Sequence, residues 1–115
     1  MSYTTLTNAT EGSAYPVTIA LTDDAGGALI PDTATWTLTD LDGNVINSRN
    51  AVSLTPASSM TLVLSGDDLD VATGYEKAER ALIIEGTYTD PTFGSGLDFR
   101  QEFRLTVEAL TEKIA

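Results

Sequence analysis

The sequence predicts an all-β fold, and three observations lead to that prediction. Apolar and polar residues alternate over several segments, which is the spacing of a half-buried strand. This alternation, rather than helical spacing, dominates the chain. Turn-forming Gly, Asp, Pro and Asn residues separate the segments at intervals of about 8 to 12 residues, as in β-sandwiches and barrels. We therefore expect one antiparallel β-sandwich of about seven to eight strands over residues 1–115.

Clear strands are expected in the first half of the chain. Alternate positions from 15 to 21 are apolar, and the segment DDAGG (residues 23–27) ends that strand. In the segment 33–39, threonines alternate with Ala34, Trp36 and Leu38. Two shorter strands are expected near residues 45–48 and 51–54.

The second half continues the alternation. Met60, Leu62 and Leu64 share one face of a strand, and the last strand has apolar residues at alternate positions from 97 to 107, interrupted only by Gln101. The segment ALIIEGTY (81–88) is apolar on both faces at its start, which suits a central strand or a covered surface. Between these strands, residues 66–79 form the longest irregular stretch, with one helical turn expected around 67–70.

The segment DLDGN (residues 40–44) has two interpretations. A calcium loop of the EF type needs Gly at its sixth position and Glu at its twelfth. Counted from Asp40, the Gly falls at the fourth position and the twelfth residue is Ala51. Asp-Gly between two alternating apolar segments is instead a strong hairpin signal, because Gly tolerates positive φ. We expect a hairpin turn, and a surface cation shared by Asp40 and Asp42 is the remaining alternative.

The inward positions of these strands define the expected core. A single Trp that faces inward on an early strand is also found in immunoglobulin-like domains, although the cysteine pair of antibody domains is missing here. We therefore expect an immunoglobulin-like arrangement. The predicted core comprises Val17, Ile19, Trp36, Leu38, Leu62, Leu64, Leu82, Ile84, Phe103 and Leu105.

Composition excludes several kinds of function. Six basic residues face seventeen acidic ones, for a net charge of −11. This charge repels phosphate backbones and anionic lipids, so neither nucleic acid nor a membrane is an expected partner. No segment reaches the length of about 18 apolar residues that a membrane helix needs. The chain has no Cys and no His, so the common nucleophile–base pairs cannot form. We expect no catalytic residues, no cofactor and no metal site.

Acidic residues near one another are the remaining candidates for chemistry. Asp67, Asp68 and Asp70 follow one another closely, but a catalytic pair needs one carboxyl group in an apolar pocket. Because these three belong to a polar stretch, we expect solvated carboxylates. Glu85, inside an apolar strand, is expected to point outward.

Four apolar residues outside the strand pattern are candidate protein contacts: Tyr75, Phe93, Leu110 and Ile114. Tyr75 and Phe93 lie in expected loops, where each either folds back over an end of the domain or serves as an interface anchor. Leu110 and Ile114 are spaced i, i+4, which suggests a short terminal helix or a C-terminal arm at 109–115 that lies on a neighbour. The Thr-rich residues 1–10 are compatible with an edge strand or an N-terminal arm.

Two segments, 40–69 and 79–110, resemble small proteins encoded among the structural genes of tailed bacteriophages. The resemblance rests on the hairpin Asp42-Gly43-Asn44, the strand end SGDDL (65–69), the pair Glu79-Arg80 and the alternating last strand that ends in VEAL (107–110). It covers about two thirds of the chain. Those proteins have an immunoglobulin-like β-sandwich, so the resemblance implies a virion protein assembled in the bacterial cytoplasm.

We therefore expect a non-enzymatic virion structural protein, with a capsid decoration or cement protein on the outer head surface as the favoured interpretation. Its expected partners are other virion proteins, above all the major capsid protein, and further copies of itself in a symmetric assembly. The alternatives are a tail, connector or baseplate component, or a carbohydrate-binding adhesion module.

Overall fold

The computed structural model describes residues 3–22, 26–72 and 75–109, and this part of the chain is all-β. It contains nine strands and one short 3-10 helix, η1. The elements are β1 (Thr4–Thr5), β2 (Ala9–Thr10), β3 (Gly12–Thr22), β4 (Ala28–Leu29), β5 (Thr33–Thr39), β6 (Val52–Ser53), β7 (Ser59–Gly66), η1 (Asp67–Leu69), β8 (Lys77–Asp90) and β9 (Gly94–Glu108). The expected number of strands was too low, because four of them pair over only two residues each and leave little trace in the sequence pattern.

The larger sheet is built around β8. Its strand order is β1-β9-β8-β5-β6, and β2 also pairs with β9. The prediction that residues 81–88 form a central strand is confirmed, since β8 has β5 on one side and β9 on the other. β1 and β2 pair with β9 in parallel, so the N-terminal segment does form an edge of this sheet.

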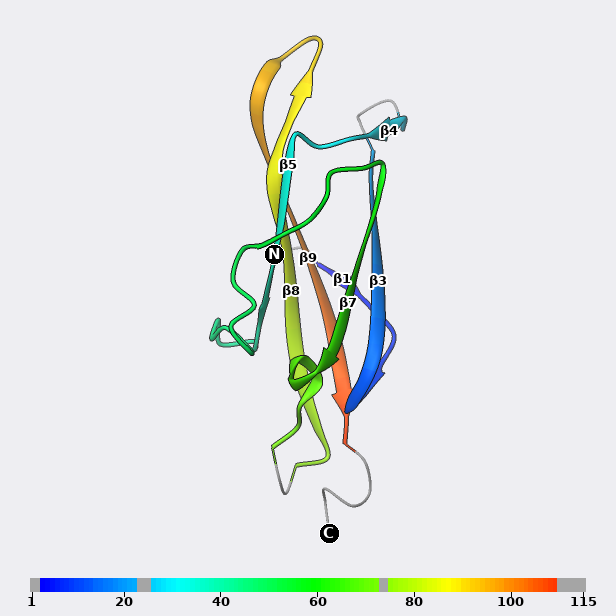
Figure 1. The fold of residues 1–115 in the computed structure, drawn as a ribbon, viewed down its shortest axis with the longest axis vertical. Coiled ribbons are helices and arrows are strands. Elements are labelled where there is room, and N and C mark those ends of the chain that lie inside the picture. Colours follow the sequence, from blue (N-terminus) through cyan, green and yellow to red (C-terminus); the bar gives the residue numbers. More distant parts are fainter. Residues whose placement is uncertain (1–2, 23–25, 73–74, 110–115) are drawn as a thin grey trace.

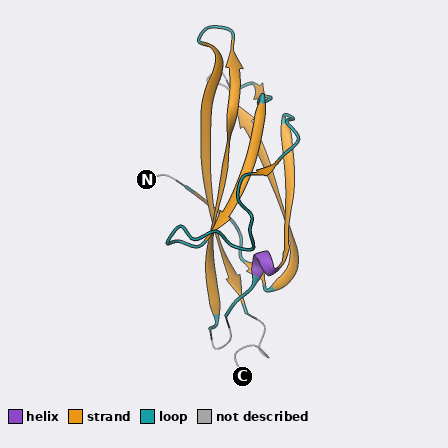
Figure 2. Ribbon diagram, turned by 60° about the vertical axis from the view of Figure 1, so that its left-hand side comes forward, coloured by secondary structure: helices purple, strands orange, loops and turns teal. Residues whose placement is uncertain are grey.

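The smaller sheet has the order β4-β3-β7 and forms a second layer beside the larger one. Figure 2 shows the two layers side by side, with η1 between the end of β7 and the start of β8. The molecule is elongated, with extents of 57 × 26 × 23 Å, and its long strands run nearly parallel to the longest axis (Figure 1).

The hydrophobic core lies between the two layers and follows the predicted alternation. All of the predicted core residues are buried except Phe103, which is only partly buried. Phe103 lines a groove between β9 and the edge of β3, where β3 has no neighbouring strand to cover the ring. Leu69 and Val71 are fully buried although they belong to the stretch expected to be irregular.

The segment that follows β5 differs from its prediction. No strand forms over residues 45–48, where only an isolated bridge joins Val45 to Thr39. Asn47, Ser48 and Ala51 have positive φ angles of 53°, 59° and 52°. This conformation is uncommon for residues other than glycine.

The turns gather at the two ends of the long axis. At one end the β8–β9 hairpin extends past the other strands, and β4 lies toward the same end (Figure 1). The opposite end carries η1 and the start of β8. These two ends hold different kinds of side-chain cluster.

Candidate functional site

Phe93 stands at the tip of the β8–β9 hairpin and is 70% exposed. The turn beneath it is well fixed, because the Asp90 Oδ1 atom accepts hydrogen bonds from the backbone N–H groups of Thr92 (2.7 Å) and Phe93 (3.1 Å). Gly94 follows with φ 101°, a conformation that favours glycine. The turn is thus held by Asp90 while the aromatic side chain of Phe93 remains in solvent.

A cleft of about 230 Å³ lies between this hairpin and the neighbouring ends of β3 and β4. We call it the end cleft. Its walls come from segments far apart in the sequence. It is lined by Leu21, Thr22, Leu29, Tyr88, Asp90, Phe93, Phe99 and Gln101. Five of these residues are apolar or aromatic, and Asp90 is the only one with a charge, so the end cleft combines apolar side chains with polar groups and one carboxylate.

Gly86 makes room for the aromatic wall of the end cleft. It pairs with Phe99 across β8 and β9. A β-carbon on Gly86 would lie 2.0 Å from the Thr33 carbonyl oxygen and 2.8 Å from the Phe99 ring. With no side chain at Gly86, the Phe99 ring lies against β8, 6.4 Å from the Tyr88 ring centroid.

Leu29 belongs to the second wall of the end cleft, and the chain that follows it is hydrogen-bonded to β8. The Asp32 backbone N–H donates to the Thr87 carbonyl oxygen (2.7 Å), and the Thr89 hydroxyl donates to Asp32 Oδ2 (2.7 Å). These bonds hold the preceding residues beside the hairpin. Ile30 is 61% exposed there, next to Leu29 of the end cleft. Two large apolar side chains, Ile30 and Phe93, are therefore exposed at one end of the molecule.

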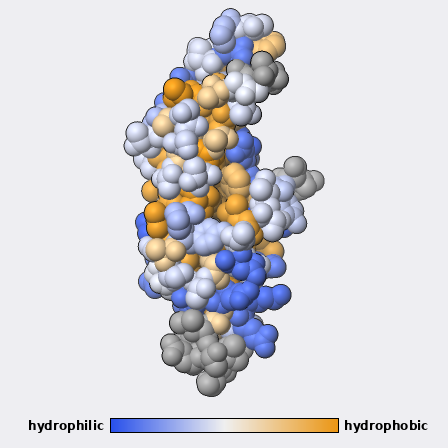
Figure 3. Space-filling view, turned by 90° about the vertical axis from the view of Figure 1, so that its right-hand side faces the viewer, coloured by the Kyte–Doolittle hydropathy of each residue, from blue (hydrophilic) through white to orange (hydrophobic). Residues whose placement is uncertain are grey.

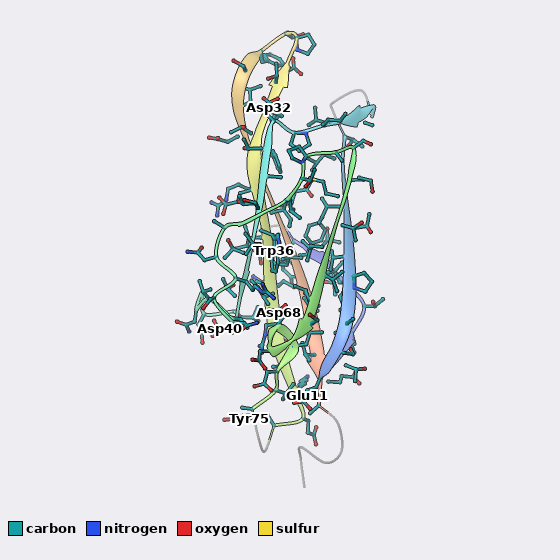
Figure 4. All side chains as sticks on the ribbon, in the orientation of Figure 1. Glu11, Asp32, Trp36, Asp40, Asp68 and Tyr75 are labelled. Carbon is teal, nitrogen blue, oxygen red and sulfur yellow. The ribbon has the colours of Figure 1, made fainter. Side chains whose placement is uncertain are left out.

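The predicted contact residues do not form one site. Tyr75 is 64% exposed, but it lies near the opposite end from Asp32 (Figure 4). The idea that Tyr75 and Phe93 fold back over the domain is wrong, since both are exposed. The Ala109 N–H donates to the Glu76 carbonyl oxygen (2.9 Å), so the chain leaves β9 beside Tyr75. Leu110 and Ile114 lie outside the described residues.

The expectation of three solvated carboxylates is wrong for Asp68. Asp67 and Asp70 are exposed, whereas the Asp68 side chain has no exposed surface. Its Oδ1 accepts hydrogen bonds from Arg49 Nε (2.8 Å) and Asn47 Nδ2 (2.9 Å), and its Oδ2 accepts one from the Ser65 N–H (3.1 Å). The 3-10 turn points Asp68 and Leu69 inward while Asp67 stays exposed, and the segment 47–49 brings two of the donors to Asp68.

Arg49 and Arg80 complete this arrangement, which we call the Asp68 cluster. The Arg49 guanidinium lies 5.6 Å from the centroid of the buried Trp36 ring while it binds Asp68. Arg80 is itself buried, and it donates hydrogen bonds to the backbone carbonyls of Asp68, Asp70 and Glu79. The two arginines therefore both bind the chain that follows β7. Arg49 binds the Asp68 side chain, and Arg80 binds the backbone carbonyls of Asp68 and Asp70.

The electrostatics of the Asp68 cluster suit a structural role. Burial alone would raise the pKa of Asp68, but hydrogen bonds from Arg49, Asn47 and Ser65 outweigh it and hold the pKa below its ordinary value. Burial lowers the pKa of Arg80, and the charges of Asp40 and Asp70 partly offset this effect. A general acid would need a raised pKa, so Asp68 is a poor proton donor at neutral pH.

The hairpin turn predicted at residues 40–44 is confirmed. Asp40 and Asn44 close the turn through a backbone hydrogen bond of 3.0 Å, and Gly43 has φ 92°. Both Asp40 carboxylate oxygens are engaged by Asn44, and Oδ1 also accepts the Asp42 N–H. The backbone and side-chain hydrogen bonds from Asn44 lower the pKa of Asp40. Within the described residues, no three acidic side chains form a group that would hold a metal ion.

No protein family model matches the chain, and neither a curated protein nor a solved structure matches it. In the part of the chain that the structure describes, no helix is long and apolar enough to cross a membrane.

Two features of the site escaped the sequence interpretation, for different reasons. The exposure of Ile30 could have been predicted from the sequence, because Ile30 is an apolar residue before Pro31 in a turn-rich stretch. The link between Asp68 and Arg49 could not be predicted in this way, because the partners are 19 residues apart and either would be equally ordinary on a surface.

Proposed function

We propose that this chain is a non-enzymatic virion structural protein that attaches to another virion protein through the end cleft. The observation that carries the proposal is the exposure of Phe93 and Ile30 beside a cleft with aromatic and aliphatic walls, on a turn held by Asp90. Large apolar side chains on fixed loops are typical anchors of protein interfaces. The acidic groups of Asp32 and Asp90 favour a partner surface with basic residues around an apolar centre.

We also propose that the fold is an immunoglobulin-like β-sandwich. The long strands can be matched in chain order to immunoglobulin strands B, C, E, F and G, which correspond to β3, β5, β7, β8 and β9. One sheet then has B beside E, and the other contains C, F and G, as in immunoglobulin domains. Trp36 is buried on the strand in the place of C, as in immunoglobulin domains. The first strands depart from the constant-domain pattern, since they pair with β9 rather than with β3.

Two features support a structural rather than a catalytic role. The chain has neither His nor Cys, and its most buried carboxylate, Asp68, has a lowered pKa and three hydrogen-bond donors. An acid or base catalyst needs a pKa near the working pH. Asp68 is instead arranged to keep its charge.

The location that we propose is the outer surface of the phage head, as a decoration or cement protein on the major capsid protein. The resemblance of residues 40–69 and 79–110 to phage structural proteins supports a virion role. The charge of −11 favours a surface away from packaged DNA. Repeated copies on a symmetric shell would multiply the strength of a modest individual contact.

The alternative of a glycan-binding module receives less support. Sugar-binding grooves of the expected kind present coplanar aromatic rings. The rings of Tyr88 and Phe99 in the end cleft are inclined at 54° to each other. This arrangement suits an irregular apolar side chain better than the flat face of a sugar.

Attachment to particles that lack the protein tests the proposal. After mixing and sedimentation, Phe93→Ala is expected to leave far fewer bound copies than the parent, because the anchor is lost. Tyr3→Ala is the matched control, since Tyr3 is also an exposed aromatic but stacks on Arg104 away from the end cleft. Unchanged binding of Phe93→Ala together with loss of binding by Tyr75→Ala would move the contact to the opposite end and refute the end-cleft model.

Copy number per particle tests the location. A decoration protein is expected in hundreds of copies, whereas roughly three to twelve copies would indicate a tail or connector ring. The second result would contradict the head location and leave the binding surface to be judged from the variants above.

A further inference from the structure

Among the residues that the structure describes, the outer face of the β3–β7 sheet carries no charged side chain. This face is formed by alternate residues of the two strands, all of them exposed: Ala14, Pro16, Thr18, Ala20, Ser59, Thr61, Val63 and Ser65. We call it the neutral face. Figure 3 looks onto this side of the molecule, where white and orange surface dominates the centre and strongly hydrophilic blue residues lie mainly toward its lower part and margins. Val63 is 49% exposed at its centre.

The outer face of the other sheet is the opposite in character. Alternate residues of β8 and β9 place charged groups there: Glu79, Glu85, Asp98, Arg100, Glu102, Arg104 and Glu108. Seventeen acidic and six basic residues are available in this chain. At least seven charged side chains lie on the outer face of β8 and β9 and none lies on the described neutral face, so a second acidic molecule meets less repulsion at the neutral face than at the other sheet.

The strand β7 also has an open edge, which borders the neutral face. Among the described strands it pairs only with β3. The Ser65 N–H points away from β3, because it donates to Asp68 Oδ2. Successive N–H groups alternate in direction along a strand, so the N–H groups of Thr61 and Val63 also point to the open edge. An edge of this kind is a template for another strand.

The outer edge of β3 is protected in a way that the edge of β7 is not. Pro16 pairs with Val63 across the two strands. Since Val63 directs its N–H away from β3, the Pro16 nitrogen lies on the outer edge of β3, where proline has no N–H to offer. Proline at an edge strand is a common protection against unwanted pairing. Ser59, Thr61, Val63 and Ser65 supply neither proline nor charge to the edge of β7.

We propose that two copies of this chain associate through their β7 edges. The two strands would run antiparallel about a two-fold axis near Leu62, extending the smaller sheet from one copy into the next. A two-fold contact requires a patch that is complementary to itself. The β7 edge meets this requirement, because each copy offers the same N–H and C=O groups at Thr61 and Val63, and the Asp68 carboxylate beside Ser65 is already paired with Arg49.

This inference does not depend on the proposed function, because it concerns the isolated protein in solution. Sedimentation equilibrium of the full chain is expected to show a reversible monomer–dimer equilibrium. Added salt is expected to strengthen the dimer, since it screens the repulsion between two chains of charge −11. A parent protein that stays monomeric at every accessible concentration and salt level would overturn the proposal.

Amide hydrogen exchange locates the contact without any substitution. The N–H groups of Thr61 and Val63 are expected to become slower to exchange as the protein concentration rises. The Thr18 N–H, which lies on the outer edge of β3, is the internal control and is expected to stay unchanged. Dimers in which Thr61 and Val63 exchange as fast as in the monomer would place the interface elsewhere and refute the β7 model.

Two substitutions test the same edge. Val63→Pro removes one outward N–H without removing a hydrogen bond to β3, and Thr61→Glu adds a charge to the neutral face. Each is expected to weaken the dimer by at least about tenfold. Thr4→Glu makes the same change in charge on exposed β1 of the other sheet and is expected to leave the dimer intact. Far-ultraviolet circular dichroism and melting curves identify any variant that fails to fold.

The outcome with particles separates a second copy from a different partner. If the free protein is monomeric but Thr61 and Val63 become protected only on particles, the edge binds a strand of another virion protein, and the proposal of a second copy is wrong.

Discussion

The Asp68 cluster and the end cleft differ in which side chains are buried and which are exposed. In the Asp68 cluster the charged side chains of Asp68 and Arg80 are buried, and each has hydrogen-bond partners inside the protein. At the end cleft the apolar side chain of Phe93 is exposed, with Ile30 exposed nearby, and the Asp90 carboxylate holds the turn beneath Phe93. A buried charge whose hydrogen bonds are satisfied holds a loop in one place. Apolar side chains that are exposed on a fixed turn are instead available to bind another protein.

This comparison teaches that neither charge nor hydrophobicity alone identifies the functional region here. Asp68 has a perturbed pKa and is fully buried, which are features of many active sites. Its hydrogen bonds nevertheless account for both properties. The Phe93 side chain carries no charge, and the hydrogen bonds of its turn do not explain why an aromatic ring is exposed there. The predictions below separate the two regions, starting with the largest expected effect.

Trp36→Ala is expected to lower the free energy of unfolding by about 3–5 kcal/mol, because it leaves a cavity in the core and removes the surface beneath Arg49. Denaturant titration followed by circular dichroism measures the change. The intrinsic fluorescence of the parent is expected to be that of a buried Trp, since Trp36 is 5% exposed. A spectrum typical of full exposure would contradict the position of Trp36.

Asp68→Ala is expected to cost about 3 kcal/mol, because Arg49, Asn47 and the Ser65 N–H would lose their common acceptor. Arg49 is partly exposed and can recover some hydration, which keeps the cost at the low end for a buried pair. Asp67→Ala is the matched control on the same 3-10 turn and is expected to change the stability by less than about 0.5 kcal/mol. Equal effects of the two substitutions would show that Asp68 is not a buried anchor.

The stability supplied by Asp68 is expected to depend on pH. Its folded-state pKa is lowered below that of the unfolded chain, so the contribution is present above the unfolded value of about 3.9 and is lost as the pH falls toward the folded value. The difference in unfolding free energy between the parent and Asp68→Asn should therefore narrow below about pH 4. A difference that stays constant through the acid range would argue against the lowered pKa.

Phe93→Ala is expected to change the free energy of unfolding by less than about 0.5 kcal/mol, since the side chain is largely in solvent. Thermal melts of the parent and the variant make the comparison with Trp36→Ala direct. If Phe93→Ala destabilises the protein as much as a core substitution, the ring packs into the end cleft in solution and is not available to a partner.

Calcium is expected to have no effect on stability. The Asp40 carboxylate already accepts hydrogen bonds from Asp42 and Asn44 within the turn. Melting curves in excess chelator and in excess calcium should coincide. A lower midpoint in chelator that disappears in Asp42→Ala would instead indicate a cation bound at the turn.

The sequence by itself determined the class of the fold and most of the core. The alternation around Ala34, Trp36 and Leu38 was enough to assign their inward face, because successive side chains of a strand point to opposite sides wherever the strand lies. The turn at residues 40–44 was equally local, since Gly43 and the side chain of Asp40 make it without help from distant parts. Phe93 could be singled out for the same reason, as an aromatic residue among turn formers.

Only the tertiary structure decided how distant segments meet. Asp68 became a buried anchor because the bend at residues 47–51 carried Arg49 to it. The end cleft exists because Leu29, Tyr88 and Phe99 come together from three different strands. The open edge of β7 likewise depends on which strands pair, and strand pairing follows from the packing of the whole core. Patterns along the chain report local backbone preference and facing, whereas contacts between remote residues are set by the global arrangement that buries the most apolar surface.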